Sequence, residues 1–239
     1  MPTTQRYFYD QNIGDDFIQL QLLHTSAVFN ANRQKLFGAS QYIKNILEIQ
    51  PEATGVVLDC GGGGAKEFHR FLCCCYSLDY PELCYPGSPE FLTEEVTYLK
   101  FLEKINVSEE IWRKNDALLE TKIKVVMQDV GGDGPEEPLK YTMAFDPWRT
   151  HVPLTKGVLV KYVVWWILVD TGSRCQLFSW HNELLRKLSS VTLTEIMSIY
   201  FESEQQVLDP RDCTPEVCVS IDIYQQGCEA VGMTLTRFD

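Results

Sequence analysis

The sequence predicts an α+β protein built of two domains, and three patterns carry this prediction. Apolar and polar residues alternate over residues 18–22, as they do in a half-buried strand. Apolar residues recur at helical spacing over residues 34–48 and again over 65–76. Past residue 118 the pattern changes, and 239 residues are enough for two modest domains. We therefore expect an N-terminal α+β domain followed by a second α+β domain of unknown type.

The first domain, residues 16–118, is expected to follow an N-terminal arm, residues 1–15, whose aromatic residues 7–9 could be exchanged with a second chain. Val28 and Phe29 are expected to form the returning strand of a hairpin that begins with the alternating stretch. The elements after the hairpin are two short helices within 34–48, a buried strand at 56–58, a helix at 65–76 and a helical stretch at 91–112. The predicted order is therefore β-β-α-β-α, followed by further helix.

The second domain, residues 119–239, is expected to open with strands. Residues 123–127 and 139–145 have the pattern of a long-looped hairpin, and the apolar run 157–169 has that of a buried central strand. The remaining patterns predict helices at 183–188 and 193–201 and strands at 217–223 and 233–235. This order predicts an α+β C-terminal domain.

The charge of the chain excludes one class of partner. It carries 33 acidic and 21 basic residues, a formal net charge of −12, and no cluster of Lys and Arg. Phosphate backbones are bound by such clusters, so we expect no direct nucleic-acid partner. The longest apolar run, 158–169, contains Lys161 and falls short of the ~20 residues that cross a bilayer, so we expect no membrane partner. No secretory signal is visible, which predicts an intracellular protein, cytoplasmic or nuclear, with reduced cysteines.

The most specific pattern spans residues 29–43. It resembles the BTB/POZ signature F-x-A-H-R-x-x-L-x-x-x-S-x-Y-F in spacing throughout, with Asn32 in place of the usual His and Ile43 in place of the usual aromatic residue. Two later blocks, 68–76 and 99–107, resemble the family's following helices in the same order. The resemblance implies a protein-interaction domain of the BTB/POZ kind.

This resemblance covers roughly residues 16–112, and it implies functions that lie on surfaces. Homodimers of the family commonly place an Asp of the first strand near the Arg of the signature, which here are Asp16 and Arg33. A solvated Asp and a surface Arg are the simpler interpretation of the same pair, because charged residues are mostly exposed. Members that recruit cullin-type ubiquitin ligases often carry an apolar-x-Glu tripeptide after the signature, a form that Ile46 and Glu48 match. We expect a homodimeric adaptor or scaffold, with a cullin as one candidate partner and no catalytic residue.

A second resemblance leads to a different function. Residues 57–64 are similar to the first motif of S-adenosylmethionine-dependent methyltransferases, a strand that ends in Asp59 and enters a glycine turn. In that interpretation Gly61 and Gly63 let the backbone approach S-adenosylmethionine, and Asp79 binds its ribose. A doubly wound sheet needs strands that alternate with helices, and the middle of the chain shows no such alternation. A methyltransferase is therefore the alternative to an interaction module, which needs no cofactor.

Several residues with metal-binding side chains lie close together in the sequence: Cys60, His69, Cys73, Cys74, Cys75 and Cys84. No C-x-x-C pair occurs among them, and adjacent cysteines do not converge easily on one tetrahedral ion. On a helix rich in Phe and Leu, a cysteine behaves as a small apolar residue. We therefore expect no metal site.

Overall fold

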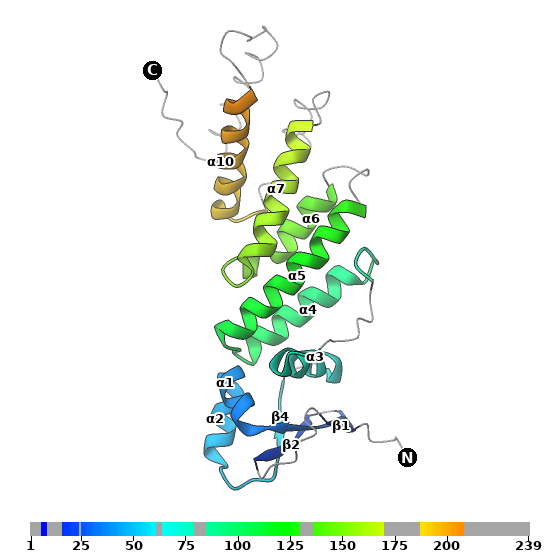
Figure 1. Cartoon of the computed structure of the whole chain (residues 1–239), viewed down its shortest axis with the longest axis vertical. Helices are drawn as coiled ribbons and strands as arrows, with labels where there is room; N and C mark the ends of the chain where they lie inside the picture. Colours follow the sequence, from blue (N-terminus) through cyan, green and yellow to red (C-terminus); the bar gives the residue numbers. More distant parts are fainter. Residues whose placement is uncertain are drawn as a thin grey trace. The chain divides into compact units, whose positions relative to one another are not determined.

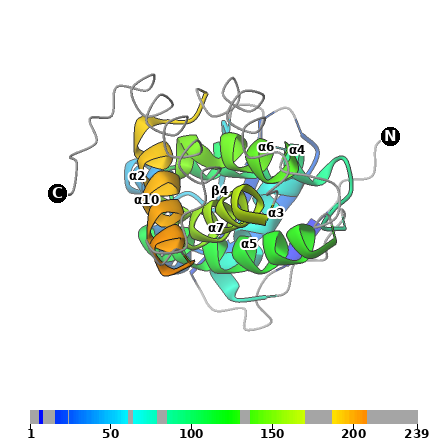
Figure 2. The same ribbon diagram turned by 90° about the horizontal axis from the view of Figure 1, so that it is seen from above.

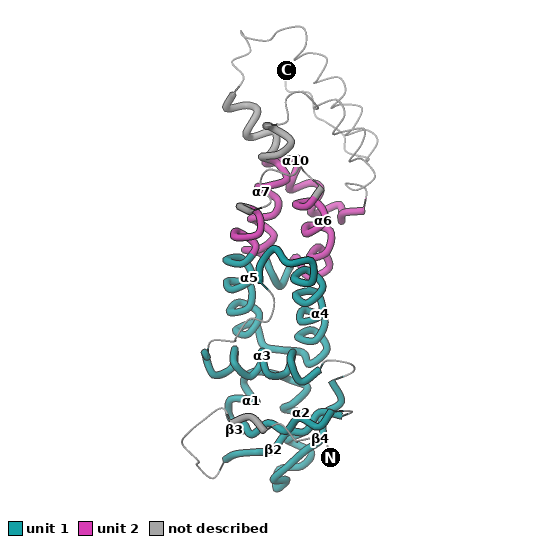
Figure 3. Tube along the Cα trace, turned by 90° about the vertical axis from the view of Figure 1, so that its right-hand side faces the viewer, with its two compact units in different colours: residues 1–122, 150–152 teal, residues 123–149, 153–239 magenta. Residues whose placement is uncertain are grey.

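The computed structural model describes residues 6–8, 16–23, 25–60, 64–78, 85–129, 136–169 and 187–207. Helices and a small sheet make up these residues, so the predicted α+β class is confirmed (Figure 1). The chain divides into two compact units (Figure 3), which are unit 1, residues 1–122 with 150–152, and unit 2, residues 123–149 with 153–239. Residue 118, where we expected a domain boundary, lies within the single helix α5 (Glu109–Asp129).

Unit 1 contains a four-stranded sheet in the order β1-β3-β2-β4. Its strands are β1 (Arg6–Phe8), β2 (Phe17–Leu22), β3 (Val28–Asn32) and β4 (Gly55–Leu58). β2 and β3 form the predicted antiparallel hairpin, β4 lies parallel to β2, and β1 lies parallel to β3. The expected N-terminal arm therefore contains a strand that pairs within its own chain.

One face of this sheet is buried and the other is open. The residues that point into the core are Ile18, Leu20, Leu22, Phe29, Ala31, Val56 and Leu58. The side chains of Gln19, Gln21 and Val57, which lie between them, are exposed. Because successive side chains of a strand point to opposite faces, the alternation in the sequence determines which face packs against the helices.

The helices of unit 1 form where polar residues can close their ends. They are α1 (Arg33–Ala39), α2 (Gln41–Ile49), α3 (Ala65–Tyr76), α4 (Phe91–Lys104) and most of α5. The Asn32 side chain accepts a hydrogen bond from the N–H of Lys35 at 3.2 Å, which caps α1. Ser40 Oγ caps α2 by accepting from the N–H of Ile43 at 3.2 Å, and it donates to the carbonyl of Ile105 at 2.5 Å. The predicted division of 34–48 into two helices is thus confirmed.

The core of unit 1 is aromatic. The ring of Phe68 on α3 lies 4.9 Å from that of Phe29 on β3, 5.8 Å from Phe71 and 6.3 Å from Phe101 on α4. Fully burying one such side chain stabilises the fold by about 1.5–3 kcal/mol. The apolar residues that predicted a helix at 65–76 therefore also fix α3 against the sheet.

Every element described in unit 2 is helical, which corrects the prediction for the second half. Its elements are the end of α5, α6 (Glu136–Phe145), the 3₁₀ turn η1 (Asp146–Trp148), α7 (Pro153–Val169) and α10 (Ser190–Val207). The predicted hairpin of 123–127 and 139–145 is wrong, because these residues belong to α5 and α6. The predicted central strand at 157–169 is wrong as well. α7 is apolar around most of its circumference, so its sequence has no periodicity that distinguishes a buried helix from a buried strand.

Within unit 2, α7 packs against both α6 and α10 (Figures 1 and 2). Lys156 of α7 forms an ion pair with Glu195 of α10. Asp146 fixes the start of α10, because its carboxylate accepts from the N–H of Ser189 at 2.8 Å and from the hydroxyls of Ser189 at 2.9 Å and Thr192 at 2.5 Å. These contacts hold three helices together.

α10 confirms the helix predicted at 193–201. The strand patterns at 217–223 and 233–235, and most of the helical pattern at 183–188, lie outside the described residues. Among the helices that the structure describes, none has the length and apolar character needed to span a bilayer.

Candidate functional site

Asp16 and Arg33 meet at the end of the β2–β3 hairpin. The N–H of Arg33 donates to the carbonyl of Asp16 at 3.0 Å, and Arg33 Nε lies 3.9 Å from Asp16 Oδ1. The guanidinium also donates to the carbonyl of Ala53. The Arg33 side chain is 13% exposed and the Asp16 side chain is 42% exposed. The structure thus brings together the two residues that the family resemblance singled out.

The register of the hairpin explains this proximity. Phe17 pairs with Asn32, so Asp16 and Arg33 are the next residues across the two strands. A partly exposed ion pair of this kind adds about 0–1 kcal/mol to stability. A guanidinium that is already fixed can be bound by another protein without first being ordered, which favours association.

Ile46 and Glu48 are both accessible on α2, but they are two residues apart, so their side chains point in nearly opposite directions around the helix. Leu47, between them, is fully buried, whereas Ile46 is half-buried and the Glu48 side chain is 55% exposed. The Glu48 carboxylate lies 3.7 Å from the ammonium of Lys44, one turn earlier. Ile49, which the sequence interpretation did not single out, is 79% exposed. Ile49 lies between Ile46 and Glu48 around the helix, so the accessible surface of α2 carries two apolar residues and one acidic residue.

Of the residues that a methyltransferase would use to bind S-adenosylmethionine, the structure describes only some. Asp59 is exposed at the end of β4, where its backbone carbonyl accepts from the Tyr42 hydroxyl at 2.9 Å. Gly61, Gly63 and Asp79 lie outside the described residues. The described residues between Gly64 and Asp129 form the helices α3, α4 and α5 and no strand, whereas a doubly wound sheet alternates strands with helices.

The four described cysteines of unit 1 lie in environments that keep their thiols protonated. Burial, together with the nearby charge of Asp59, raises the pKa of the Cys60 thiol to about 11. Burial also raises the pKa values of Cys73, Cys74 and Cys75. The thiolate is the form that attacks electrophiles and binds metals, so these side chains serve packing. Among the described residues no group of His, Cys, Asp and Glu is placed to hold a metal ion, and Cys84 lies outside them.

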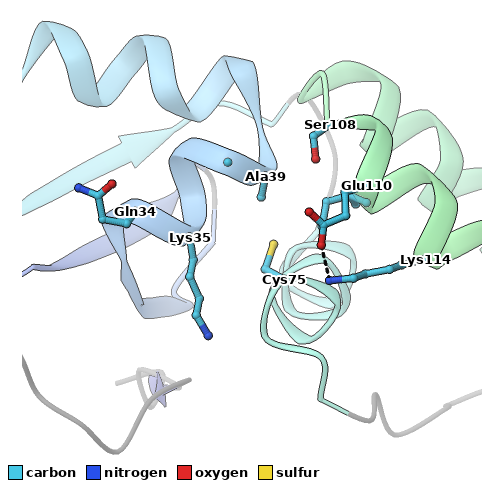
Figure 4. A pocket seen from close by; sticks show the side chains of 9 residues that line it. Gln34, Lys35, Ala39, Cys75, Ser108, Glu110 and Lys114 are labelled. Carbon is cyan, nitrogen blue, oxygen red and sulfur yellow. Dashed lines mark ion pairs between the residues drawn. The ribbon is translucent and has the colours of Figure 1, made fainter.

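A pocket that the sequence interpretation did not single out lies between α1, α3 and the start of α5 (Figure 4). Its volume is about 240 Å³, below the ~300–1,000 Å³ of typical small-molecule sites. Of the residues that line it, Lys114 lies 2.8 Å from the Glu110 carboxylate, and the ammonium of Lys35 lies 4.1 Å above the ring of Tyr76. The size of this pocket suits one side chain of another protein better than a cofactor.

The chain matches no family model, no curated protein and no solved structure. Its functional assignment therefore depends on its own residues and their geometry.

A buried group of charges connects α3, α4 and α5. Arg70 donates two hydrogen bonds to the Glu95 carboxylate, at 3.0 and 2.7 Å, and Lys122 donates a third at 3.0 Å. The guanidinium of Arg70 also lies 3.9 Å above the ring of Tyr98. Burial alone would raise the pKa of Glu95, but the charges and hydrogen bonds of Arg70 and Lys122 outweigh it and lower that pKa. The carboxylate is thus held ionised in the interior, where it fixes the mutual arrangement of the three helices.

Proposed function

We propose that this chain is a protein-interaction module of the BTB/POZ type, which self-associates and acts as an adaptor or scaffold. The observation that carries the proposal is the pair of Asp16 and Arg33. The family resemblance implies such a pair at a dimer interface, and in this chain the two side chains lie 3.9 Å apart beside the sheet.

The environments of the other signature positions support the same proposal. Phe29, Ala31 and Leu36 are fully buried, so the apolar positions of the signature form the core. Ser40 is buried and links the cap of α2 to Ile105 near the end of α4. The segment therefore uses its apolar and hydroxyl residues for the fold, as the resemblance implies.

Cullin recruitment is the more specific form of the proposal. Ile46 and Glu48 are accessible on α2, and the exposed Ile49 enlarges the apolar surface beside them. Apolar anchors next to a charged group are typical of protein-binding surfaces. In this form the first unit binds the ligase and the second unit binds a substrate protein.

Charge reversal tests the self-association. Arg33→Glu and Asp16→Lys should each shift the chain toward monomer by about tenfold in dissociation constant, because each places like charges in the interface. Light scattering measures the shift. The matched control is the double reversal Glu137→Lys with Lys140→Glu, an exposed pair at 3.2 Å on α6, which should leave the mass unchanged. Unaltered dimers in both single variants would contradict the interface.

Capture of a cullin from a cell lysate tests the more specific form. Ile46→Ala combined with Glu48→Ala should abolish capture while preserving the dimer. The control, Leu118→Ala with Glu120→Ala, changes the same apolar-x-Glu form on α5, where Leu118 is exposed, and should retain most of it. Equal capture by both double variants would refute the assignment of Ile46 and Glu48.

A further inference from the structure

The outer edge of β4 has unbonded backbone groups. The carbonyl of Leu58 accepts from the N–H of Leu23 at 2.8 Å, so one side of β4 is bonded to the β2 segment. Because the groups of a strand point alternately to its two sides, those of Gly55 and Val57 face away from β2. On that side neither residue makes a hydrogen bond to any part of the chain that the structure describes. β4 is also the last strand in the order of the sheet.

Two exposed apolar side chains lie beside this edge. Val57 is 57% exposed and Leu23 is 43% exposed. Val57 pairs with Gln21, and Leu23 lies two residues further along, on the same open face of the sheet. Proteins commonly protect an edge with Lys, Pro or a bulge, and β4 has the sequence Gly-Val-Val-Leu without any of them. A short added strand would bond the free groups and cover both side chains.

The charges around β4 determine which kind of strand would fit. Glu52 precedes the strand and Asp59 follows it, and both are exposed. A second copy of β4, laid antiparallel, would bring Glu52 of one copy near Asp59 of the other, and like charges at such positions repel. A strand with basic residues at its ends would instead pair with both carboxylates.

We propose that the edge of β4 binds an extended segment of a partner protein, with an apolar residue beside Val57 and Lys or Arg at both ends. Backbone hydrogen bonds supply the affinity of such an added strand, and its alternate side chains supply the selectivity. This site goes beyond self-association through Asp16 and Arg33. Neither of those residues belongs to β4, so the two proposals can fail separately.

Two fluorescent heptapeptides that differ only in their end charges test this site. One is Lys-Thr-Val-Thr-Val-Thr-Lys, the other has Glu at both ends, and both have blocked termini. The full chain should bind the basic peptide saturably and the acidic peptide at least about tenfold more weakly, because Glu52 and Asp59 attract one and repel the other. Added salt should reduce the difference.

Substitutions of Val57 distinguish the contribution of backbone hydrogen bonds to peptide binding from the contribution of charge. Val57→Pro removes an N–H that faces away from β2, so the sheet keeps its bonds while the basic peptide binds about tenfold more weakly. Val57→Lys keeps the backbone groups and should shift the preference toward the acidic peptide. The matched control is Leu78→Ala, at an exposed apolar residue after α3, which should change neither affinity.

Amide hydrogen exchange on the unaltered chain provides a readout that does not depend on how a variant folds. The basic peptide should slow exchange at Gly55 and Val57. Equal binding of the two peptides, unchanged binding by folded Val57→Pro, or no added protection at those amides would overturn the proposal. Self-association that is lost in Val57→Pro would overturn it too, because a second copy would then be the occupant.

Discussion

Helix α3 meets two different environments within one turn. Phe68 and Phe71 enter the aromatic core, whereas Arg70, which lies between them in the sequence, joins the buried charges of Glu95 and Lys122. Apolar burial is non-directional and insensitive to pH. A buried ion group stabilises the fold only while every partner is present and charged. The aromatic side of α3 therefore supplies stability, and the charged side determines which arrangement of helices is stable.

The largest expected effect is on the aromatic side. Phe68→Ala should lower the free energy of unfolding by about 3–5 kcal/mol, because it leaves a cavity among Phe29, Phe71 and Phe101. Urea denaturation measures the change. The control Leu78→Ala removes an exposed side chain and should lower it by no more than about 0.5 kcal/mol. Similar losses in the two variants would contradict the placement of the core.

Removal of one charge from the buried ion group on the charged side of α3 should lower the free energy of unfolding somewhat less. Glu95→Gln leaves Arg70 and Lys122 buried without a counter-charge, and it should destabilise the fold by about 3 kcal/mol. The control is Glu94→Gln, the neighbouring residue, whose ion pair with Lys66 is half-exposed and contributes about 0–1 kcal/mol. Equal denaturation midpoints for the two variants would show that the charges are not buried together.

The charged side should also make stability depend on pH. The pKa of Glu95 is lower in the folded chain than its usual 4.5, so its contribution is fully present above pH 4.5 and is lost as the pH falls through the lowered value. The melting temperature should therefore decline on acidification below that pH. In Glu95→Gln the decline should be shallower, and parallel curves for the two proteins would contradict the assignment.

The smallest effect is expected when the whole ion group is replaced. The triple substitution Arg70→Met, Glu95→Leu and Lys122→Met removes the charges together and fills their space with apolar atoms, so stability should stay within about 1 kcal/mol of the unaltered chain. Urea denaturation again measures it. A loss as large as that of Glu95→Gln alone would mean that the charges supply net stability and not only specificity.

Helices and strands whose apolar residues recur at a regular spacing were predictable from the sequence, and those without such a spacing were not. Strand β2 alternates strictly, and α3 repeats its apolar residues every three or four positions, so each followed from the sequence. The apolar run that forms α7 has no such period, and its many Val residues favoured a strand. The end of α5 did carry a helical spacing, at Ile123, Val126 and Met127, which the prediction of a hairpin overlooked.

The candidate sites show the same division. The proximity of Asp16 and Arg33 was expected from the family resemblance, which implies an Asp of the first strand near the Arg of the signature. No spacing reveals that Arg70 meets Glu95, 25 residues away, or that Lys122 joins them, because the meeting depends on how three helices pack. The open edge of β4 depends on the order of strands in the sheet, which a sequence pattern does not specify.

The most direct test of the proposed function is the molar mass of the unaltered chain in solution. Light scattering over a range of micromolar concentrations should give twice the 27.5 kDa of one chain, because the charged pair beside β2 is expected to lie at a symmetric interface. Dilution should return the mass to that of a single chain. A mass of 27.5 kDa at every concentration, with no partner captured from lysate, would contradict the proposal that this protein acts by binding other proteins.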